Sequence, residues 1–319
     1  MDRNRVLLYA VCLVAAIFPL LSGEYTTRVA IGALKYVVLA ISFDILARTG
    51  NMSVGHAALF GIGAYAAALS NVYFGVPMEL GPLVGGLAVL PLAVALGFLT
   101  LRMRGAYFSI ATLAFAEAMR VLFLYARGVT FGAMGVGVPP IFGGNVVVDY
   151  YVILGIVTLS ILLVVLLERT GVNYAFSAIR ENEDAASVLG VNPTKYKVLA
   201  FALSALLAGA AGGFDAGYTT YVYPYEAFSV AISVAAMIMP IFGGLYTIEG
   251  PILGAVVIYI AEEVLRGWLP FGYTLVYGLA LIVSILYLPR GIVGLLRGMK
   301  GRGWIESLGM GAGRGKKLG

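Results

Sequence analysis

The sequence predicts an all-α protein, a polytopic bundle of about ten transmembrane helices with one helix held outside the lipid. Two observations predict this fold class. Of the 319 residues, 61% are hydrophobic and only 12% are charged, whereas soluble domains carry about 25% charged residues. The apolar residues also gather into runs close to the roughly 20 residues that a helix needs to cross a bilayer. The single cysteine, Cys12, can form no internal disulfide.

Ten apolar runs are the candidate membrane spans. They cover residues 6–22, 30–47, 55–73, 81–101, 106–125, 151–167, 197–217, 228–242, 250–265 and 272–288. The third, eighth and ninth runs are interrupted by glycine or proline, which makes them candidates for broken or re-entrant segments. The first run also has the form of a secretory signal. No small-residue cleavage site follows it, so an uncleaved span is the favoured interpretation.

The basic residues predict the orientation of the spans. Of the 21 Lys and Arg residues, 16 fall on the side of the N-terminus, three on the opposite side, and two, Lys35 and Arg120, within spans. Positive charge marks the cytoplasmic side of a membrane protein. We therefore expect a multi-pass cell-membrane protein with both termini in the cytoplasm.

A charged segment, AIRENEDAASVLG at residues 178–190, lies between two apolar runs on the predicted cytoplasmic side. We expect one short helix here, with Asn173 as the cap at its start and Gly190 at its end. Arg180 and Asp184 are four residues apart and are expected to pair across one turn.

Within this segment, Asp184, Ala185 and Ala186 are followed three residues later by Gly190. This spacing resembles the "EAA…G" loop of ABC-importer permeases, with Asp in place of the usual Glu. In that family the loop is a coupling helix that docks in a groove of the ATPase subunit. The alternative interpretation is a solvated helix that only connects two spans.

Four further segments extend the resemblance to nearly the whole chain. They are residues 50–69, 101–122, 178–213 and 242–255, in this order. Together they resemble the LivM-type inner-membrane permease of branched-chain amino-acid ABC transporters (the LivH/LivM permease family). Two stretches depart from the family pattern. They are FGAMGVG at residues 131–137, and Tyr246 with Glu249, where small residues usually follow the paired glycines.

The resemblance implies a set of partners. They are a LivH-type sister permease, two cytoplasmic ABC ATPases that bind ATP-Mg, and an extracytoplasmic substrate-binding protein, with no cofactor in this chain itself. It implies a permease domain at residues 1–296, with a coupling loop at about 168–196, and a basic cytoplasmic tail at 297–319. The residues that it assigns to ATPase coupling are Arg180, Glu181, Glu183, Asp184, Ala185, Ala186, Leu189 and Gly190. The tail is expected to contact anionic membrane lipid and not nucleic acid.

Candidate residues for the translocation pathway lie in or beside the spans. They are Gly55, His56, Glu117, Arg120, Gly243, Gly244, Gly250 and Pro251. His56 begins the third span and is either a polar group near the pathway or a satisfied histidine at the membrane interface. Glu117 and Arg120 are expected to pair, as part of the pathway or as a brace between helices.

The glycines have two interpretations as well. Small residues four apart, such as Gly209 and Gly213 or Gly250 and Gly254, favour close helix packing. Alternatively, the breaks at 243–244 and 250–251 turn helix ends toward the pathway, where their dipoles would meet a zwitterionic amino acid. Asp44 and Asp215 lie near span ends and are expected to be solvated, and Glu262 and Glu263 are expected to snorkel.

The remaining function classes find less support in the sequence. An enzyme would need paired catalytic groups or a metal site, and the chain has one His and one Cys. The C-terminal GAGRGKK lacks the spacing of a phosphate-binding loop, so we expect ATP to be hydrolysed by separate subunits. An ABC permease for urea or short amides remains an alternative. An ion-coupled secondary transporter is more distant, because no cluster of mid-membrane carboxylates stands out.

Overall fold

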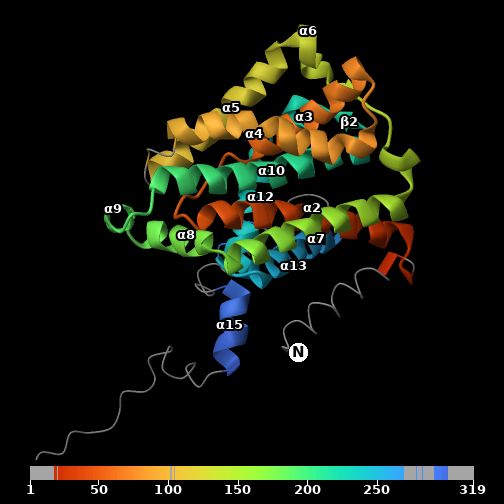
Figure 1. Ribbon diagram of the computed structural model, residues 1–319. Coiled ribbons are helices and arrows are strands. Elements are labelled where there is room, and N and C mark those ends of the chain that lie inside the picture. Colours follow the sequence, from red (N-terminus) through yellow and green to blue (C-terminus); the bar gives the residue numbers. More distant parts are fainter. Residues whose placement is uncertain are drawn as a thin grey trace, which may run out of the picture.

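The computed structural model describes residues 21–100, 105–268 and 291–300, together with the single residues 18, 19, 103, 278 and 282. Helices dominate this part of the chain (Figure 1). The long helices are α2 (Glu24–Ala47), α3 (His56–Phe74), α4 (Gly81–Thr100), α5 (Ala106–Tyr125), α7 (Val146–Arg169), α10 (Pro193–Thr219), α12 (Val230–Gly243) and α13 (Glu249–Trp268). The shorter helices are α6 (Arg127–Thr130), α8 (Gly171–Glu181), α9 (Glu183–Val188), α11 (Pro224–Ala227), α15 (Gly291–Lys300) and the 3-10 turns η1 (Met78–Leu80), η2 (Gly132–Met134) and η3 (Ile141–Gly144). Strands β1 (Val136–Gly137) and β2 (Tyr221–Val222) pair antiparallel, with Val136 opposite Val222.

Within the described residues, seven helices are long and apolar enough to cross a membrane, which confirms the second to eighth predicted spans. The ninth forms the continuous helix α13 but is not among the seven. It carries Glu249, Glu262, Glu263 and Arg266, more charge than a lipid-exposed span tolerates. The first and tenth predicted spans lie almost wholly outside the described residues. The chain is therefore a multi-pass membrane protein, with seven of the ten expected spans confirmed.

The three spans predicted to be interrupted differ from one another. The third is the unbroken helix α3. The eighth is broken, because α11 ends at Ala227 and α12 begins at Val230, with Ser229 capping the new start. The ninth begins only after the non-helical stretch 244–248. A helix of 14 residues such as α12 rises only about 21 Å, so α11 and α12 must act together to cross a bilayer about 30 Å thick.

Helices α3, α4 and α10 meet where their backbones touch, at what we call the glycine crossing. Its members are Gly63, Gly81, Gly85, Gly209 and Gly213. A Cβ added to Gly85 would lie 2.5 Å from the carbonyl oxygen of Gly209, and one added to Gly209 would lie 2.6 Å from that of Gly85. Glycine is required here because any side chain would push the helices apart. The contacts confirm the predicted close packing of Gly209 and Gly213, whereas their partners Gly63, Gly81 and Gly85 were not predicted.

Helix α2 lies at the centre of a group of four other helices. It packs against α7, α10, α12 and α13, and Val37, Val38 and Leu39 are fully buried. Residues 37–41 are buried on every side of the helix, and an apolar segment of this kind needs neighbours all around it. On one flank, α12 and α13 also cross through glycines, since a Cβ on Gly254 would overlap the backbone of Met239 and Gly243.

The charged segment 178–190 forms two helices and not the single helix that the sequence predicts. Helix α8 begins at Gly171 with Thr170 at its N-cap, so Asn173 lies inside the helix and is not its cap. The chain then breaks at Asn182, whose side chain accepts hydrogen bonds from the backbone of Asp184 and Ala185 and caps α9. The predicted cap at Asn173 is therefore wrong, and Asn182 is the asparagine that caps a helix here. Both residues are of a type that favours an N-cap, so the sequence alone does not distinguish them. Helices α8 and α9 lie at one end of the bundle and β2 lies at the opposite end (Figure 1).

The predicted domain boundary at residue 296 falls inside α15, which runs to Lys300. The tail beyond Lys300 lies outside the described residues. Helix α15 contacts α12 and α13, and Gly291 at its start lies so close to Gly244 that an added Cβ would be 2.6 Å from the Gly244 nitrogen. The start of α15 is therefore packed against the break between α12 and α13.

Candidate functional site

The end of the bundle that carries α8 and α9 holds a group of charged and aromatic side chains that we call the polar junction. Its members are Asp44, Arg48, Glu168, Arg180 and Tyr246. They come from the end of α2, the end of α7, α8, and the stretch 244–248 between α12 and α13. These segments are distant in sequence, so only the fold brings the five residues together.

Arg48 holds the inner part of the polar junction. Its Nε lies 2.9 Å from Asp44 Oδ2, and its Nη1 lies 3.1 Å from Glu168 Oε1 and 3.3 Å from Asn173 Oδ1. Asp44 and Arg48 are only 1% and 3% exposed, so the expectation that Asp44 is solvated is wrong. Charges buried this deeply persist only when they are paired and hydrogen-bonded. Burial opposes the charge on Arg48, but the two neighbouring carboxylates outweigh it and raise the Arg48 pKa.

Tyr246 links this inner pair to the surface helix. Its backbone nitrogen donates a hydrogen bond of 2.7 Å to Asp44 Oδ1, while the Arg180 guanidinium lies 4.0 Å from the centre of its ring. Burial raises the pKa of the Tyr246 phenol, so the ring that faces Arg180 is neutral. A cation over a neutral aromatic face is stabilising. Tyr246 also adopts a positive φ of 65°, a conformation that non-glycine residues adopt only when their surroundings hold them there.

Helix α8 is held against the bundle by a second contact. Gly50, in the turn after α2, has φ +84°, and a Cβ there would lie 3.4 Å from the Arg180 Cα. The expected pairing of Arg180 with Asp184 depended on one continuous helix, and the break at Asn182 interrupts that register. Arg180 instead approaches Glu181 at 3.6 Å and stacks on Tyr246.

The rest of the predicted coupling segment has an anchored side and an exposed side. Glu183 lies 2.8 Å from the buried Lys197 of α10, and Ala186 is buried. At the tip of α9, Val188 and Leu189 are 87% and 81% exposed. Gly190 ends the segment with φ +87°, as glycine at a helix end commonly does. Two apolar side chains thus project into solvent beyond an anchored short helix.

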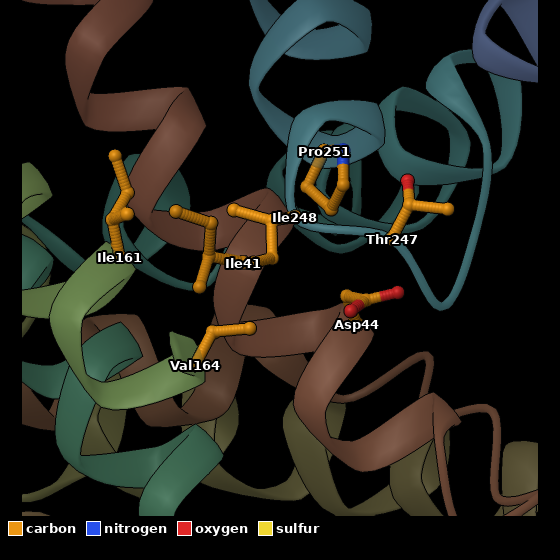
Figure 2. A pocket seen from close by; sticks show the side chains of 7 residues that line it. All are labelled: Ile41, Asp44, Ile161, Val164, Thr247, Ile248 and Pro251. Atoms are coloured by element: carbon orange, nitrogen blue, oxygen red, sulfur yellow. The ribbon is translucent and has the colours of Figure 1, made fainter. Parts of the chain in front are cut away.

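A narrow pocket lies beside the polar junction, between α2, α7 and the start of α13 (Figure 2). It is lined by Ile41, Asp44, Ile161, Val164, Thr247, Ile248 and Pro251. Figure 2 shows Asp44 facing the stretch that carries Thr247 and Ile248. Asp44 is the only charged residue among these seven, and every other lining side chain except that of Thr247 is apolar.

The four candidates at the glycine breaks, Gly243, Gly244, Gly250 and Pro251, are all buried. The predicted backbone break is present, because α12 ends at Gly243 and α13 starts at Glu249. The glycines also pack backbone against backbone, since a Cβ on Gly243 would overlap the carbonyl of Gly250. The glycines that flank the break are therefore buried while Tyr246 between them is 37% exposed, and the role of these residues in a pathway stays a prediction.

Gly55 and His56 occupy a tightly packed start of α3. His56 is fully buried, with Nε2 3.1 Å from Ser204 Oγ and its ring 5.3 Å from that of Phe43. A Cβ on Gly55 would lie 2.5 Å from the carbonyl oxygen of Thr112 in α5. Among the described residues no group of three or more His, Cys, Asp and Glu is placed to hold a metal ion.

Glu117 and Arg120 pair as predicted, with Glu117 Oε2 2.7 Å from Arg120 Nη2. The Arg120 guanidinium also lies 5.4 Å from the ring of Tyr225 in α11. Helix α11 follows the end of α10 that is remote from α8 and α9. These two candidates are therefore separate from the polar junction.

Sequence reasoning missed most of the polar junction. Asp44 and Arg48 carried a signal, since they stand four apart at the end of an apolar run and so face the same side of a helix. In the sequence, Tyr246 stands out only because the family usually has small residues after the paired glycines. Its contact with Arg180 spans two segments that no local pattern connects.

The chain is similar in sequence to known transport permeases. A family model described as "Branched-chain amino acid transport system / permease component" matches residues 25–288. The chain is 28% identical to the high-affinity branched-chain amino acid transport system permease protein LivM of Salmonella typhimurium and 27% identical to the LivM protein of Escherichia coli, each over 92% of this chain and 76% of the relative. It is 27% identical to the LivH permease protein of Escherichia coli over 52% of this chain and 58% of the relative. No solved structure matches the chain.

Proposed function

This chain belongs to the family of permease components of branched-chain amino-acid transport systems, and on that premise we propose that it is the membrane-spanning permease subunit of an ATP-driven importer. It would act with a LivH-type sister permease, two cytoplasmic ATPases that bind ATP-Mg, and an extracytoplasmic binding protein. The transported substrate would be a branched-chain amino acid. Its relatives are transport permease proteins, and the chain would bind no cofactor of its own.

One observation carries the proposal, the contact between the surface helix α8 and the interior of the bundle. Arg180 of α8 stacks on Tyr246, and Tyr246 is hydrogen-bonded to Asp44 in α2. A force applied to α8 by a soluble partner would therefore reach both the central helix and the break between α12 and α13. A helix that only connects two spans has no need of such contacts.

The exposed tip of α9 supports a partner at this place. Val188 and Leu189 project from a segment that is otherwise polar, and Glu183 and Lys197 hold that segment on α10. A pair of exposed apolar residues on an anchored helix is suited to insertion into a groove of another protein. In this assignment α8, α9 and both termini are cytoplasmic, in agreement with the distribution of positive charge.

The experiment is co-purification of the ATPase subunits with the permease pair, followed by uptake of radiolabelled leucine into proteoliposomes. Asp184→Lys and Leu189→Asp alter the exposed side of α9, whereas Lys195→Gln, exposed at the start of α10, is the matched control. We expect loss of the ATPases with the first two variants, unchanged recovery with the control, and leucine uptake that requires ATP.

The outcomes separate the candidate functions. Full ATPase recovery with both α9 variants would contradict the proposed docking surface, and ion-gradient-driven uptake without ATPases would favour a secondary transporter. Uptake of urea in place of leucine would keep the importer but replace its substrate.

A further inference from the structure

Lys35 of α2 and Asp215 of α10 form an ion pair with 2.7 Å between Nζ and Oδ1. Lys35 is the twelfth of the 24 residues of α2 and Asp215 the 23rd of the 27 residues of α10, so the pair lies in the part of the bundle remote from α8 and α9. It is remote from the polar junction, which begins nine residues later at Asp44. Asp215, expected to be solvated near a span end, is paired here instead.

The surroundings of this pair are partly open. The Lys35 and Asp215 side chains are 21% and 18% exposed, in contrast to the 1% and 3% of Asp44 and Arg48. Charged groups within membrane-spanning helices almost always face the interior of a bundle or a water-filled cavity, because exposure to lipid is costly. The open side of the pair is therefore a place that water or a polar ligand reaches.

A line of polar residues leads to the pair from the end of the bundle opposite α8 and α9. Glu24, Arg28 and Lys35 share one face of α2, and the buried Gly32 between Arg28 and Lys35 lies under the hydroxyl of Tyr259. On the neighbouring helix α13, Glu263 accepts a hydrogen bond of 3.1 Å from Tyr25. Polar groups that follow one helix face inward from the membrane surface are typical of the wall of an aqueous pathway.

Aromatic rings border the pair on its apolar sides. The Lys35 Nζ lies 5.5 Å from the ring centre of Tyr36 and 6.0 Å from that of Phe60, and the Tyr36 ring lies 5.4 Å from that of Tyr259 in α13. Gly32 makes room for Tyr259, because a Cβ at Gly32 would overlap the Tyr259 hydroxyl. An opposite-charge pair next to aromatic walls matches a small zwitterion with an apolar side chain.

We propose that the Lys35–Asp215 ion pair is a binding site for a zwitterionic substrate on the translocation pathway. The substrate carboxylate would pair with Lys35 and its ammonium group with Asp215, while the aliphatic side chain packs against Tyr36 and Tyr259. The site is neutral both empty and occupied, so binding moves no net charge into the membrane. This proposal rests on the proposed function, and it assigns to two side chains the substrate contact that the sequence had suggested for helix ends.

The test uses a thiol placed beside an intact pair. In the purified importer complex, with Cys12→Ser as background, Tyr259→Cys is treated with a positively charged methanethiosulfonate reagent, which reacts only where water reaches the thiol. Leu159→Cys, an exposed apolar position near the middle of α7, is the matched control. We expect reaction at position 259 and none at 159. Because Tyr259 lines the proposed site, the dissociation constant of leucine is measured for this variant. At ten times that concentration, competition should slow the reaction about tenfold.

The chemical selectivity of this protection identifies the site. Leucinol, which lacks the carboxylate, and 4-methylpentanoate, which lacks the ammonium group, should protect far less than leucine. With Lys35→Met and Asp215→Asn together, the thiol should still react but leucine should no longer protect it. A pair that only braces α2 against α10 would not produce this pattern.

Three results would overturn the proposal: no reaction at position 259, protection that persists in the neutral double variant, or protection by urea and not by leucine. ATPase recovery and ATP hydrolysis are measured on the same preparation. Loss of both in the unmodified complex would contradict the proposed function itself, whereas intact ATPase activity without leucine protection would contradict only the zwitterion site.

Discussion

The glycine crossing and the polar junction join helices in opposite ways. At the glycine crossing, α3, α4 and α10 touch through their backbones, so that a Cβ on Gly85 would lie 2.5 Å from the carbonyl of Gly209. At the polar junction, side chains bridge the gap, with 2.9 Å between Arg48 and Asp44 and 4.0 Å between Arg180 and the Tyr246 ring. Backbones in contact leave no alternative spacing, whereas long side chains can exchange partners. We therefore expect α3, α4 and α10 to move as one body, and relative movement to take place at the polar junction.

The largest expected effect comes from placing a side chain in the glycine crossing. Gly213→Val forces α10 away from Gly81, whose carbonyl already occupies the place of a Cβ, so we expect little or no folded protein in membranes. The measurement is the monodisperse yield after detergent extraction. Gly155→Ala is the control, because nothing lies within 4 Å of its Cβ position in α7, and it should be neutral. Near-normal yield of Gly213→Val would mean that the three helices are not a rigid body.

Removal of the central cation of the polar junction should be the next largest effect. Arg48→Ala leaves Asp44 buried with only the Tyr246 nitrogen as a partner. Breaking a buried ion pair costs about 3–5 kcal/mol, so we expect a clear fall in the midpoint of thermal unfolding. The double variant Asp44→Asn, Arg48→Met should be less destabilised than Arg48→Ala alone. If the single variant unfolds at the normal temperature, the junction is solvated and not buried.

Changes at Tyr246 should affect coupling more than stability. Tyr246→Leu removes the ring under Arg180, a contact worth about 0.5–1 kcal/mol at a partly exposed site, whereas Tyr246→Phe keeps it. We expect Tyr246→Leu to hydrolyse ATP normally with reduced leucine uptake per ATP, and Tyr246→Phe to behave as the unmodified chain. The ratio of uptake to hydrolysis in proteoliposomes measures this. Equal ratios in both variants would remove Tyr246 from the coupling route.

The smallest effect is expected at an exposed ion pair that belongs to neither region. Glu24 and Arg28 pair at 2.7 Å across one turn of α2 and are largely exposed. Pairs of this kind contribute about 0.3–0.5 kcal/mol, so Glu24→Gln should shift the unfolding midpoint by little more than the error of the measurement. A shift comparable to that of Arg48→Ala would contradict the expectation that the exposed Glu24–Arg28 ion pair contributes less to stability than the buried Asp44–Arg48 pair.

The sequence was sufficient for the helices and for the glycine packing, because both depend on local patterns. Apolar runs predicted seven spans that the structure confirms, and small residues four apart predicted the close packing of Gly209, Gly213, Gly250 and Gly254. It was not sufficient where a contact joins distant segments. Arg48 meets Glu168 across 120 positions of the chain, and Asp44 meets Tyr246 across 202. Neither contact has a local signature. The ninth predicted span is likewise not confirmed, because α13 carries Glu249, Glu262, Glu263 and Arg266.

The glycine crossing also has a consequence for the genetics of this chain. Every missense change that a single base makes in a glycine codon produces a residue with a Cβ. No single-base substitution at the glycine crossing is therefore small enough to fit. A saturating library should therefore show Gly63, Gly81, Gly85, Gly209 and Gly213 as positions without tolerated alleles. Second-site suppressors should not arise there by trimming a neighbour, because the opposing atom is a backbone oxygen that no codon change removes.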